Sequence, residues 1–358
     1  MITTDIVVIG AGPAGLNAAI TAASMGANVL LLERNVLEGG QLIKQTHKFF
    51  GSKAQHAAAR GIDIAKALYQ SASQYPNVTM KFGATVLGYY EDGVITAEHH
   101  ESIITIKAKK YIVATGAAEK SLPFPNNDLP GIYGAGAVQT LTNVYGVLPG
   151  KKVLMIGSGN IGLIVSYQLL QAGVQVAGIV EAAPEIGGYL VHAAKIRRAG
   201  VPIYTSYTIK EAYGTEMVEG ALIMQLDKNW QPLSGTEIDI PVDVVCIAVG
   251  LTPLTELLWQ AGCKMKYVPQ LGGHIPVRDE NLTTTVSDIY VAGDVSGIEE
   301  ASAAMVEGKL AGAAAASSLG YGSGKFAEIR REALAQLAEL RSGPAGAKIR
   351  KGLKLLVG

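Results

Sequence analysis

Short apolar runs that end in glycine recur along the chain and predict buried parallel strands. The first run is residues 5–9 (DIVVI), which lead into the turn GAGPAG, and a close copy, residues 152–156 (KVLMI), leads into GSGNIG. A stretch of small and apolar residues follows each turn and predicts a helix. Apolar strands without alternation are typical of parallel sheets that helices cover on both faces. The pattern therefore predicts an α/β fold with two Rossmann-like units.

Each unit continues into a second apolar strand that ends in an acid. Glu33 lies 23 residues after Gly10, and Glu181 lies 24 residues after Gly157. In each turn the first glycine permits the tight bend, the second lets backbone approach a pyrophosphate, and the third lets helix and strand pack closely. An acid at this offset can accept the hydroxyls of an adenosine ribose. The repeat predicts two dinucleotide sites, and the alternative is one site beside a degenerate copy kept for packing.

Further patterns complete the units and add a tail. Apolar strands at residues 111–117 and 244–250 close the two units, and residues 283–297 predict another buried strand. Residues 300–319 form a run of small residues, and residues 326–341 place apolar positions on one side of a predicted helix.

The end of the chain differs in character from the rest. Gly343-Pro344 ends the amphipathic helix, and four cations follow without an acid: Lys348, Arg350, Lys351 and Lys354. Two interpretations of this basic tail stay open, a frayed terminus or a docking arm for a partner subunit.

Charge and cysteine content exclude several classes of function. Lys plus Arg and Asp plus Glu are both 30, so no net field attracts nucleic acid or an anionic membrane surface. No apolar run of about 18 residues is uninterrupted, and no basic leader opens the chain, so we expect neither a membrane span nor a secretory signal. Cys246 and Cys263 fit no redox or metal spacing, and the histidines do not cluster. We therefore expect a cytoplasmic protein without a metal site.

The motifs together resemble those of the pyridine nucleotide-disulfide reductase class of flavoproteins. They are GAGPAG with its acid, GGQL (39–42), ATGA (114–117), GSGNIG and IYVAGD (289–294). Over about residues 3–320 the layout is similar to that of low-molecular-weight thioredoxin reductases. The resemblance implies a discontinuous FAD domain, an inserted NAD(P) domain and a tail: residues 1–119 with 249–320 for FAD, residues 120–248 for NAD(P), and residues 321–358 for a C-terminal helix and basic tail.

The resemblance also implies the residues that contact each cofactor. For FAD these are Gly10, Gly12, Pro13, Ala14, Gly15, Glu33, Arg34, Gly40, Gln41, Thr46, Val86, Thr115, Gly116, Gly293, Asp294 and Ala301. For the nicotinamide dinucleotide they are Gly157, Gly159, Asn160, Ile161, Gly162, Glu181 and Gly250. Asp294 would accept hydrogen bonds from the flavin's ribityl chain, or else cap the next helix, whose N-terminus near Ala301 would face the flavin. Glu299 and Glu300 are expected to be ordinary acids of that helix's first turn.

One motif of the resembled reductases is missing. Their C-x-x-C pair lies about 14 residues before the second glycine turn, where this chain has Thr140-Leu-Thr142-Asn143. Threonine and asparagine cannot cycle through a disulfide, so the chain is expected not to reduce thioredoxin. The candidate replacement is the loop 39–51, in which Lys44 and His47 are the candidate catalytic residues because they offer positive charge and a titratable imidazole. The alternative is a solvated surface loop.

The second acid also predicts which nucleotide is used. A carboxylate at Glu181 suits a free ribose 2′-hydroxyl and repels a 2′-phosphate. Residues 182–184 offer no cation, and Arg197 and Arg198 are expected on a helix face farther along. The sequence therefore predicts NADH rather than NADPH.

Three functions stay open. The first is an NAD(P)H-linked FAD oxidoreductase that is the flavoprotein subunit of a larger complex, similar to the dithiol-free subunits of amine and amino-acid dehydrogenases. The second is a stand-alone reductase of ferredoxin, quinone or oxygen, and the third is a non-catalytic dinucleotide-binding scaffold. The first implies a redox partner and an oligomer, formed by this chain or with other subunits.

Overall fold

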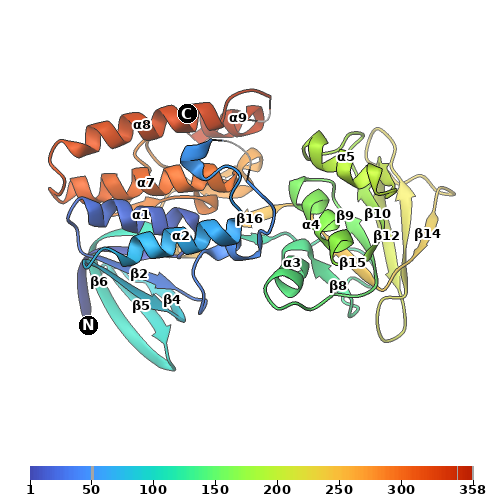
Figure 1. Cartoon of the computed structure of the whole chain (residues 1–358), viewed down its shortest axis with the longest axis horizontal. Helices are drawn as coiled ribbons and strands as arrows, with labels where there is room; N and C mark the ends of the chain where they lie inside the picture. Colours follow the sequence, from blue (N-terminus) through green and yellow to red (C-terminus); the bar gives the residue numbers. More distant parts are fainter. Residues whose placement is uncertain (50–51, 345, 357–358) are drawn as a thin grey trace. The chain divides into compact units, whose positions relative to one another are not determined.

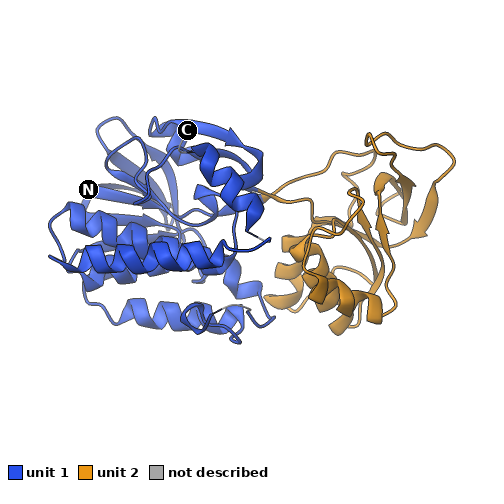
Figure 2. Cartoon of the chain, turned by 90° about the horizontal axis from the view of Figure 1, so that it is seen from above, with its two compact units in different colours: residues 1–118, 252–358 blue, residues 119–251 orange. Residues whose placement is uncertain are grey.

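The chain divides into two compact units (Figure 2). Unit 1 combines Met1–Ala118 with Thr252–Gly358, and unit 2 is the inserted segment Glu119–Leu251. The computed structural model (Figure 1) describes three stretches of the chain: residues 1–49, 52–344 and 346–356. The end of the loop 39–51 and the last two residues of the tail lie outside these stretches.

Unit 1 is built on a seven-stranded sheet with β1 (Ile2–Ile9) near its centre. β1 pairs in parallel with β2 (Val29–Glu33) and β6 (Ser102–Val113), because all three are apolar runs buried at their carboxyl ends. In the described residues of this sheet, the antiparallel pairs are β4 with β5 and β5 with β6. The other strands of the sheet are β3 (Val78–Phe82), β4 (Ala84–Tyr89), β5 (Val94–His99) and β19 (Ile289–Val291).

Helices cover one face of this sheet, and a second helical layer lies outside them (Figure 1). α1, α2 and α7 lie on the sheet, and α8 packs on the outer side of α7. Residues 84–113 and α6 close the opposite face around a second core. The helices of unit 1 are α1 (Pro13–Ser24), α2 (Gly61–Ser73), α6 (Glu256–Gln260), α7 (Ala301–Ser318), α8 (Lys325–Leu340) and α9 (Ala347–Leu356).

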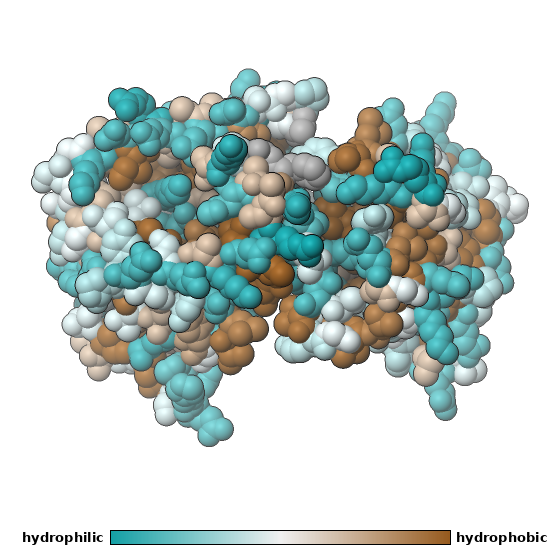
Figure 3. Space-filling model, in the orientation of Figure 1, coloured by the Kyte–Doolittle hydropathy of each residue, from teal (hydrophilic) through white to brown (hydrophobic). Residues whose placement is uncertain are grey.

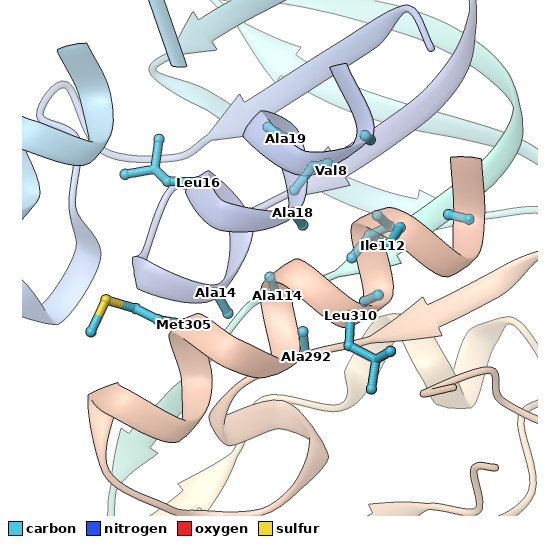
Figure 4. Packing of buried hydrophobic residues seen from close by; sticks show 14 of the residues in the cluster. Val8, Ala14, Leu16, Ala18, Ala19, Ile112, Ala114, Ala292, Met305 and Leu310 are labelled. Carbon is cyan, nitrogen blue, oxygen red and sulfur yellow. The ribbon is translucent and has the colours of Figure 1, made fainter. Parts of the chain in front are cut away.

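α1 and α7 pack closely against each other in unit 1 (Figure 4). A Cβ on Gly308 would lie 2.1 Å from the carbonyl oxygen of Ala14, and one on Gly312 would lie 2.3 Å from that of Ala18. The run of small residues in α7 is therefore required by the backbone of α1, which carries the first glycine turn at its start.

The C-terminal segment, which the sequence sets apart as a tail, lies in unit 1. α8 buries Ala333 and Leu337 in the core that it shares with α7. α9 packs Ile349, Leu353 and Leu356 with residues of the short 3-10 segment η3 (Pro269–Leu271) and the strand after it. Ala347–Leu356 therefore form a docked helix rather than a frayed segment, because these apolar residues recur at helical spacing among the cations.

Unit 2 holds a five-stranded parallel sheet and a three-stranded antiparallel sheet. The parallel sheet runs in the order β11-β10-β9-β15-β8 and carries α3, α4 and α5. Its strands are β8 (Ile132–Gly134), β9 (Lys152–Ile156), β10 (Gln175–Glu181), β11 (Ile203–Thr205) and β15 (Val244–Ile247). The helices are α3 (Ala135–Asn143), α4 (Asn160–Gln171) and α5 (Leu190–Arg198). The antiparallel strands are β12 (Tyr207–Tyr213), β13 (Gly220–Gln225) and β14 (Ile238–Pro241).

Two short ribbons complete the structure. β7 (Ala117–Glu119) pairs with β16 (Leu251–Pro253) where the chain passes between the units, and β17 (Met265–Val268) pairs with β18 (Gly273–Pro276) in unit 1. Hydrophilic and apolar residues are interspersed on the visible face of the molecule (Figure 3). Within the three described stretches, no helix is both long and apolar enough to cross a membrane.

Candidate functional site

The first glycine turn joins β1 to α1. At two of its three glycines the backbone leaves no space for a Cβ atom, and at the third it does. Gly10 has φ +106°, and a Cβ there would lie 2.4 Å from the carbonyl oxygen of Ala114. A Cβ on Gly15 would lie 1.8 Å from the carbonyl oxygen of Gly10, whereas one on Gly12 would meet nothing within 4 Å. The fold therefore requires the outer glycines, and the middle one faces open space at the N-terminus of α1, which begins at Pro13.

The acid at the end of β2 is fixed against this turn. Glu33 is 5% exposed, and its Oε2 accepts the backbone N–H of Ala11 at 2.7 Å. Its Oε1 accepts the backbone N–H and the side-chain amide of Asn35, each at 2.9 Å. Arg34, between them, is exposed. The carboxylate is thus placed at the edge of the turn, where an adenosine ribose would lie.

The second glycine turn, between β9 and α4, repeats this geometry. Gly157 has φ +108°, and its Cβ would lie 2.3 Å from the carbonyl oxygen of Ala248. A Cβ on Gly162 would lie 2.1 Å from the carbonyl oxygen of Gly157, and one on Gly159 would meet nothing within 4 Å. The same division into two closed positions and one open position argues against a degenerate copy kept only for packing.

The second acid is held in the same way as the first. Glu181 Oε2 accepts the backbone N–H of Ser158 at 3.0 Å and its hydroxyl at 2.6 Å. The other oxygen accepts the N–H of Ala183 at 2.9 Å. In both units the residue after the first glycine therefore donates to the acid. Arg197 and Arg198 lie at the far end of α5 and are exposed, so neither contacts this carboxylate.

A glycine pair follows each acid by six and seven residues and bonds to the turn. Gly39 donates its N–H to the carbonyl oxygen of Ala11 at 2.8 Å, and Gly188 donates to that of Ser158 at 2.9 Å. The pair in unit 2, which begins at Gly187, was not anticipated from the sequence. Its identical offset from the acid is the signal that identifies it.

Three other predicted contacts of the nicotinamide dinucleotide lie around the second turn or in the connection to unit 1. Asn160 opens α4, and its Oδ1 accepts the N–H of Tyr189 at 2.9 Å, which ties the glycine pair to the helix. Ile161 is 38% exposed beside it. Gly250, with φ +120°, accepts the N–H of Lys120 at 3.0 Å.

The turn after β19 carries the predicted flavin-contacting acid. Gly293 has φ +78° and lies against Ala14 of the first turn's helix, 2.9 Å from where the glycine's Cβ would be. Burial raises the pKa of Asp294 to about 7, and the neighbouring carboxylates of Glu307, Glu299 and Glu300 add to this. Asp294 Oδ1 accepts the N–H of Glu299 at 3.4 Å, one residue before the N-cap of α7. The bond does not reach the first turn of α7 itself.

Glu299 is not the ordinary first-turn acid that the sequence predicts. Its two carboxylate oxygens accept hydrogen bonds of 2.7 and 2.9 Å from Arg341, at the end of α8. Arg341 also donates to Glu307 of α7 at 2.7 Å. Sequence reasoning missed this cluster because its members lie 34 and 42 residues apart, beyond any local pattern.

Two other predicted FAD contacts follow the carboxyl end of β6, and two lie elsewhere in unit 1. Thr115 donates its hydroxyl to the carbonyl oxygen of Leu254 at 2.7 Å, and Gly116, with φ +75°, would have open space at its Cβ. Ala301 is the first residue of α7, and Val86 lies in β4. The contact of these four residues with FAD stays a prediction.

The loop after Gly39 begins beside the first turn. A Cβ on Gly40 would lie 3.0 Å from the Cα of Gly12, and η1 (Gly40–Lys44) follows with Gln41 exposed. Farther on, the ring of His47 stacks on that of Phe49 with centroids 5.7 Å apart. In the sequence, Thr46 stands between Lys44 and His47. The catalytic roles of Lys44 and His47 stay predictions.

Residues 140–143, where the resemblance implies a dithiol in the reductases, form the last turn of α3. Thr140 donates its hydroxyl to the carbonyl oxygen of Gly136 at 2.8 Å, and Asn143 ends the helix. Cys246 and Cys263 are buried, free and in different units, and burial raises the pKa of both thiols. Among the described residues, no three His, Cys, Asp or Glu side chains gather as a metal site would require.

Comparison with known proteins gives relatives that are subunits of oxidases. The chain is 30% identical to an opine oxidase subunit of Agrobacterium tumefaciens (strain Ach5), over 88% of this chain and 66% of that one. It is 28% identical to the alpha subunit of sarcosine oxidase from Corynebacterium sp. (strain P-1), over 96% of this chain and 34% of that one. The chain therefore spans about two thirds or less of these relatives.

Solved structures share the fold. L-proline dehydrogenase from P. horikoshii matches 94% of this chain and 59% of its own, with 26% identity and a TM-score of 0.74. Thioredoxin reductase from T. acidophilum matches 89% of this chain and 99% of its own, with 25% identity and a TM-score of 0.73. The family model for pyridine nucleotide-disulphide oxidoreductases, whose members bind FAD, matches residues 4–308. The chain belongs to the pyridine nucleotide-disulphide oxidoreductase family of flavoproteins.

Proposed function

We propose that the chain is an FAD-dependent oxidoreductase that exchanges electrons between NAD(H) and a donor or acceptor other than thioredoxin, as the flavoprotein subunit of a larger dehydrogenase complex. The observation that carries the proposal is the repeated turn geometry. Each turn holds an acid against the residue after its first glycine, and each leaves its middle glycine facing open space. Two such sites in one chain suit two dinucleotides.

The residues of unit 1 fit FAD. The open side of Gly12 and the N-terminus of α1 would receive the pyrophosphate, and Glu33 would accept the ribose hydroxyls. Asp294 would accept a hydrogen bond from the cofactor, and the N-terminus of α7 would supply partial positive charge near Ala301. Bound there, FAD would supply the electron transfer that protein side chains cannot perform.

The residues of unit 2 fit NAD(H) better than NADP(H). Glu181 is fixed by Ser158 and Ala183, so its carboxylate cannot swing away from an added 2′-phosphate without losing three hydrogen bonds. Within the described parts of the chain the hydrogen bonds of Glu181 come from Ser158 and Ala183 and not from an arginine, and Arg197 and Arg198 lie at the other end of α5. The carboxylate would therefore accept the free ribose hydroxyls and repel the phosphate.

The exit for electrons is proposed to be direct rather than through a dithiol. Cys246 and Cys263 are each buried and lie in different units, so they offer no exposed pair for exchange. Electrons would then pass to a small molecule or to a partner's redox centre. The names of the relatives, which are subunits of oxidases, favour a partner. The exposed cations of α9, Lys348, Lys351 and Lys354, offer a surface for it.

Turnover of the purified chain with two kinds of acceptor tests this proposal. With NADH, the chain should reduce ferricyanide and should not reduce thioredoxin or an aromatic disulfide reagent above background. Rapid steady turnover by the chain alone with ferredoxin, quinone or oxygen would favour the stand-alone reductase instead. Tight nucleotide binding without any flavin reduction would favour the scaffold. Disulfide reduction by the wild-type chain would contradict the proposal, because no cysteine pair could carry it.

A further inference from the structure

A buried charge cluster lies under the turn that carries Asp294. Its members are two acids and two arginines whose side chains are 3 to 13% exposed: Arg278, Glu299, Glu307 and Arg341. Arg278 follows β18, and Arg341 follows the last residue of α8. Glu299 lies just before α7, and Glu307 lies within that helix. The positive and negative charges balance within the cluster, which reduces the cost of burial.

Glu307 fixes both ends of the short segment η4 (Asp294–Ser296). Its Oε2 accepts the backbone N–H of Gly293 at 2.9 Å and the hydroxyl of Ser296 at 2.7 Å. Arg278 and Arg341 outweigh the effect of burial and hold the pKa of Glu307 below its usual value. This carboxylate therefore ties the two ends of the turn together.

Arg341 contacts two acids that are themselves hydrogen-bonded to this turn. It makes a two-pronged contact with Glu299, whose N–H in turn bonds to Asp294, and a third contact with Glu307. Arg278 contacts Glu307 with a longer bond, at 3.3 Å. Without Arg341 the cluster would keep two buried carboxylates and one arginine, and Glu299 would lose its charged partner.

The last helix is connected to the same group. Arg350 of α9 donates to the backbone carbonyls of Arg341 and of Gly343 and so closes the end of α8. A continuous series of polar contacts therefore runs from the basic helix through the backbone of Arg341 to the turn of Asp294.

We propose that Arg341 is a positioning residue for the flavin site, through which the C-terminal helices set the affinity and the redox potential of the bound FAD. The proposal rests on FAD binding at the first glycine turn, as proposed above. α8 and α9 would then contribute to FAD binding, in addition to any role of α9 in docking a partner.

The test replaces Arg341 and a matched arginine of the same helix. Arg330 of α8 pairs with Glu280 and donates to Asn281, each at 2.7 Å, but its side chain is half-buried, at 35% exposure, and that of Glu280 is 77% exposed. Arg341→Met should weaken FAD binding by about 2- to 30-fold, the range seen for residues along a coupling network. It should also lower the flavin midpoint potential, because an uncompensated negative charge opposes the addition of electrons. Arg330→Met should change neither quantity.

The conservative variant Arg341→Lys separates charge from geometry. It keeps the positive charge and loses the two-pronged contact, so it should weaken FAD binding while leaving the potential closer to that of the wild type. It also carries the test if Arg341→Met fails to fold. Wild-type values of both affinity and potential in Arg341→Lys and Arg341→Met would overturn the inference. A wild-type chain that takes up no FAD would overturn the proposed function, and this inference with it.

Discussion

Replacing Gly12 by alanine should separate FAD binding from folding. Gly12 has φ −74° and ψ −175°, a conformation that any residue adopts, and its Cβ would meet nothing within 4 Å. Gly15 is the matched control in the same turn, because its Cβ would lie 1.8 Å from the carbonyl oxygen of Gly10. The methyl group of Gly12→Ala would lie in open space, whereas that of Gly15→Ala would overlap a backbone carbonyl.

The magnitudes follow from these contacts. Gly12→Ala should leave the flavin-free protein as stable as the wild type or raise its free energy of unfolding by about 0.4–1 kcal/mol, because alanine restricts the unfolded chain. Its methyl group would lie where the pyrophosphate approaches, and overpacking of about 1–3 kcal/mol corresponds to FAD binding that is about 5- to 150-fold weaker. Gly15→Ala should cost about 3 kcal/mol or more in the flavin-free protein.

Urea unfolding of the flavin-free variants, together with FAD titration by fluorescence quenching, measures both effects. The reasoning is wrong if Gly12→Ala binds FAD as tightly as the wild type, or if it loses as much stability as Gly15→Ala. Gly12→Val, with a larger side chain, should give a colourless protein that still folds.

Three further variants test other parts of the account. Gly159→Val should keep its yellow colour and lose reduction by NADH, and a variant that NADH still reduces would contradict the assignment of the second turn. Gly308→Ala should lower the free energy of unfolding by about 3 kcal/mol, because its Cβ would lie 2.1 Å from the carbonyl oxygen of Ala14, and an unchanged melting curve would refute that contact. Since folding raises the pKa of Asp294 from 3.8 to about 7, the flavin-free protein should lose about 2 kcal/mol of stability between about pH 5.5 and pH 8. Asp294→Asn should remove this loss, and an equal loss in the variant would exclude Asp294 as its source.

Local patterns predicted the elements that carry their own signal. The two strand–turn–helix units follow from apolar runs and glycine spacing within about 25 residues of chain, and α1 begins at Pro13 as expected. The amphipathic run 326–341 became α8, and the small-residue run 300–319 became α7, each within two residues. In these segments the physical cause of the element lies in neighbouring residues.

Interactions across long sequence separations could not be predicted in this way. The basic tail resembles a frayed end in sequence because its cations obscure three apolar residues, and those residues bury only because η3 lies beneath them. Glu299 resembles a surface acid until Arg341 is brought to it by the packing of α8 on α7. The glycine pair at Gly187 was detectable in principle, because comparison of the two units gives the same offset from each acid.

Anaerobic addition of NADH to the purified chain tests the central claim most directly. We predict a yellow protein that releases FAD on denaturation, and a visible flavin absorbance that NADH removes faster than NADPH does. A colourless preparation that takes up no FAD on reconstitution, or a bound flavin that neither nucleotide reduces, would contradict the claim. The claim is that this chain binds FAD and NAD(H) and transfers electrons between them.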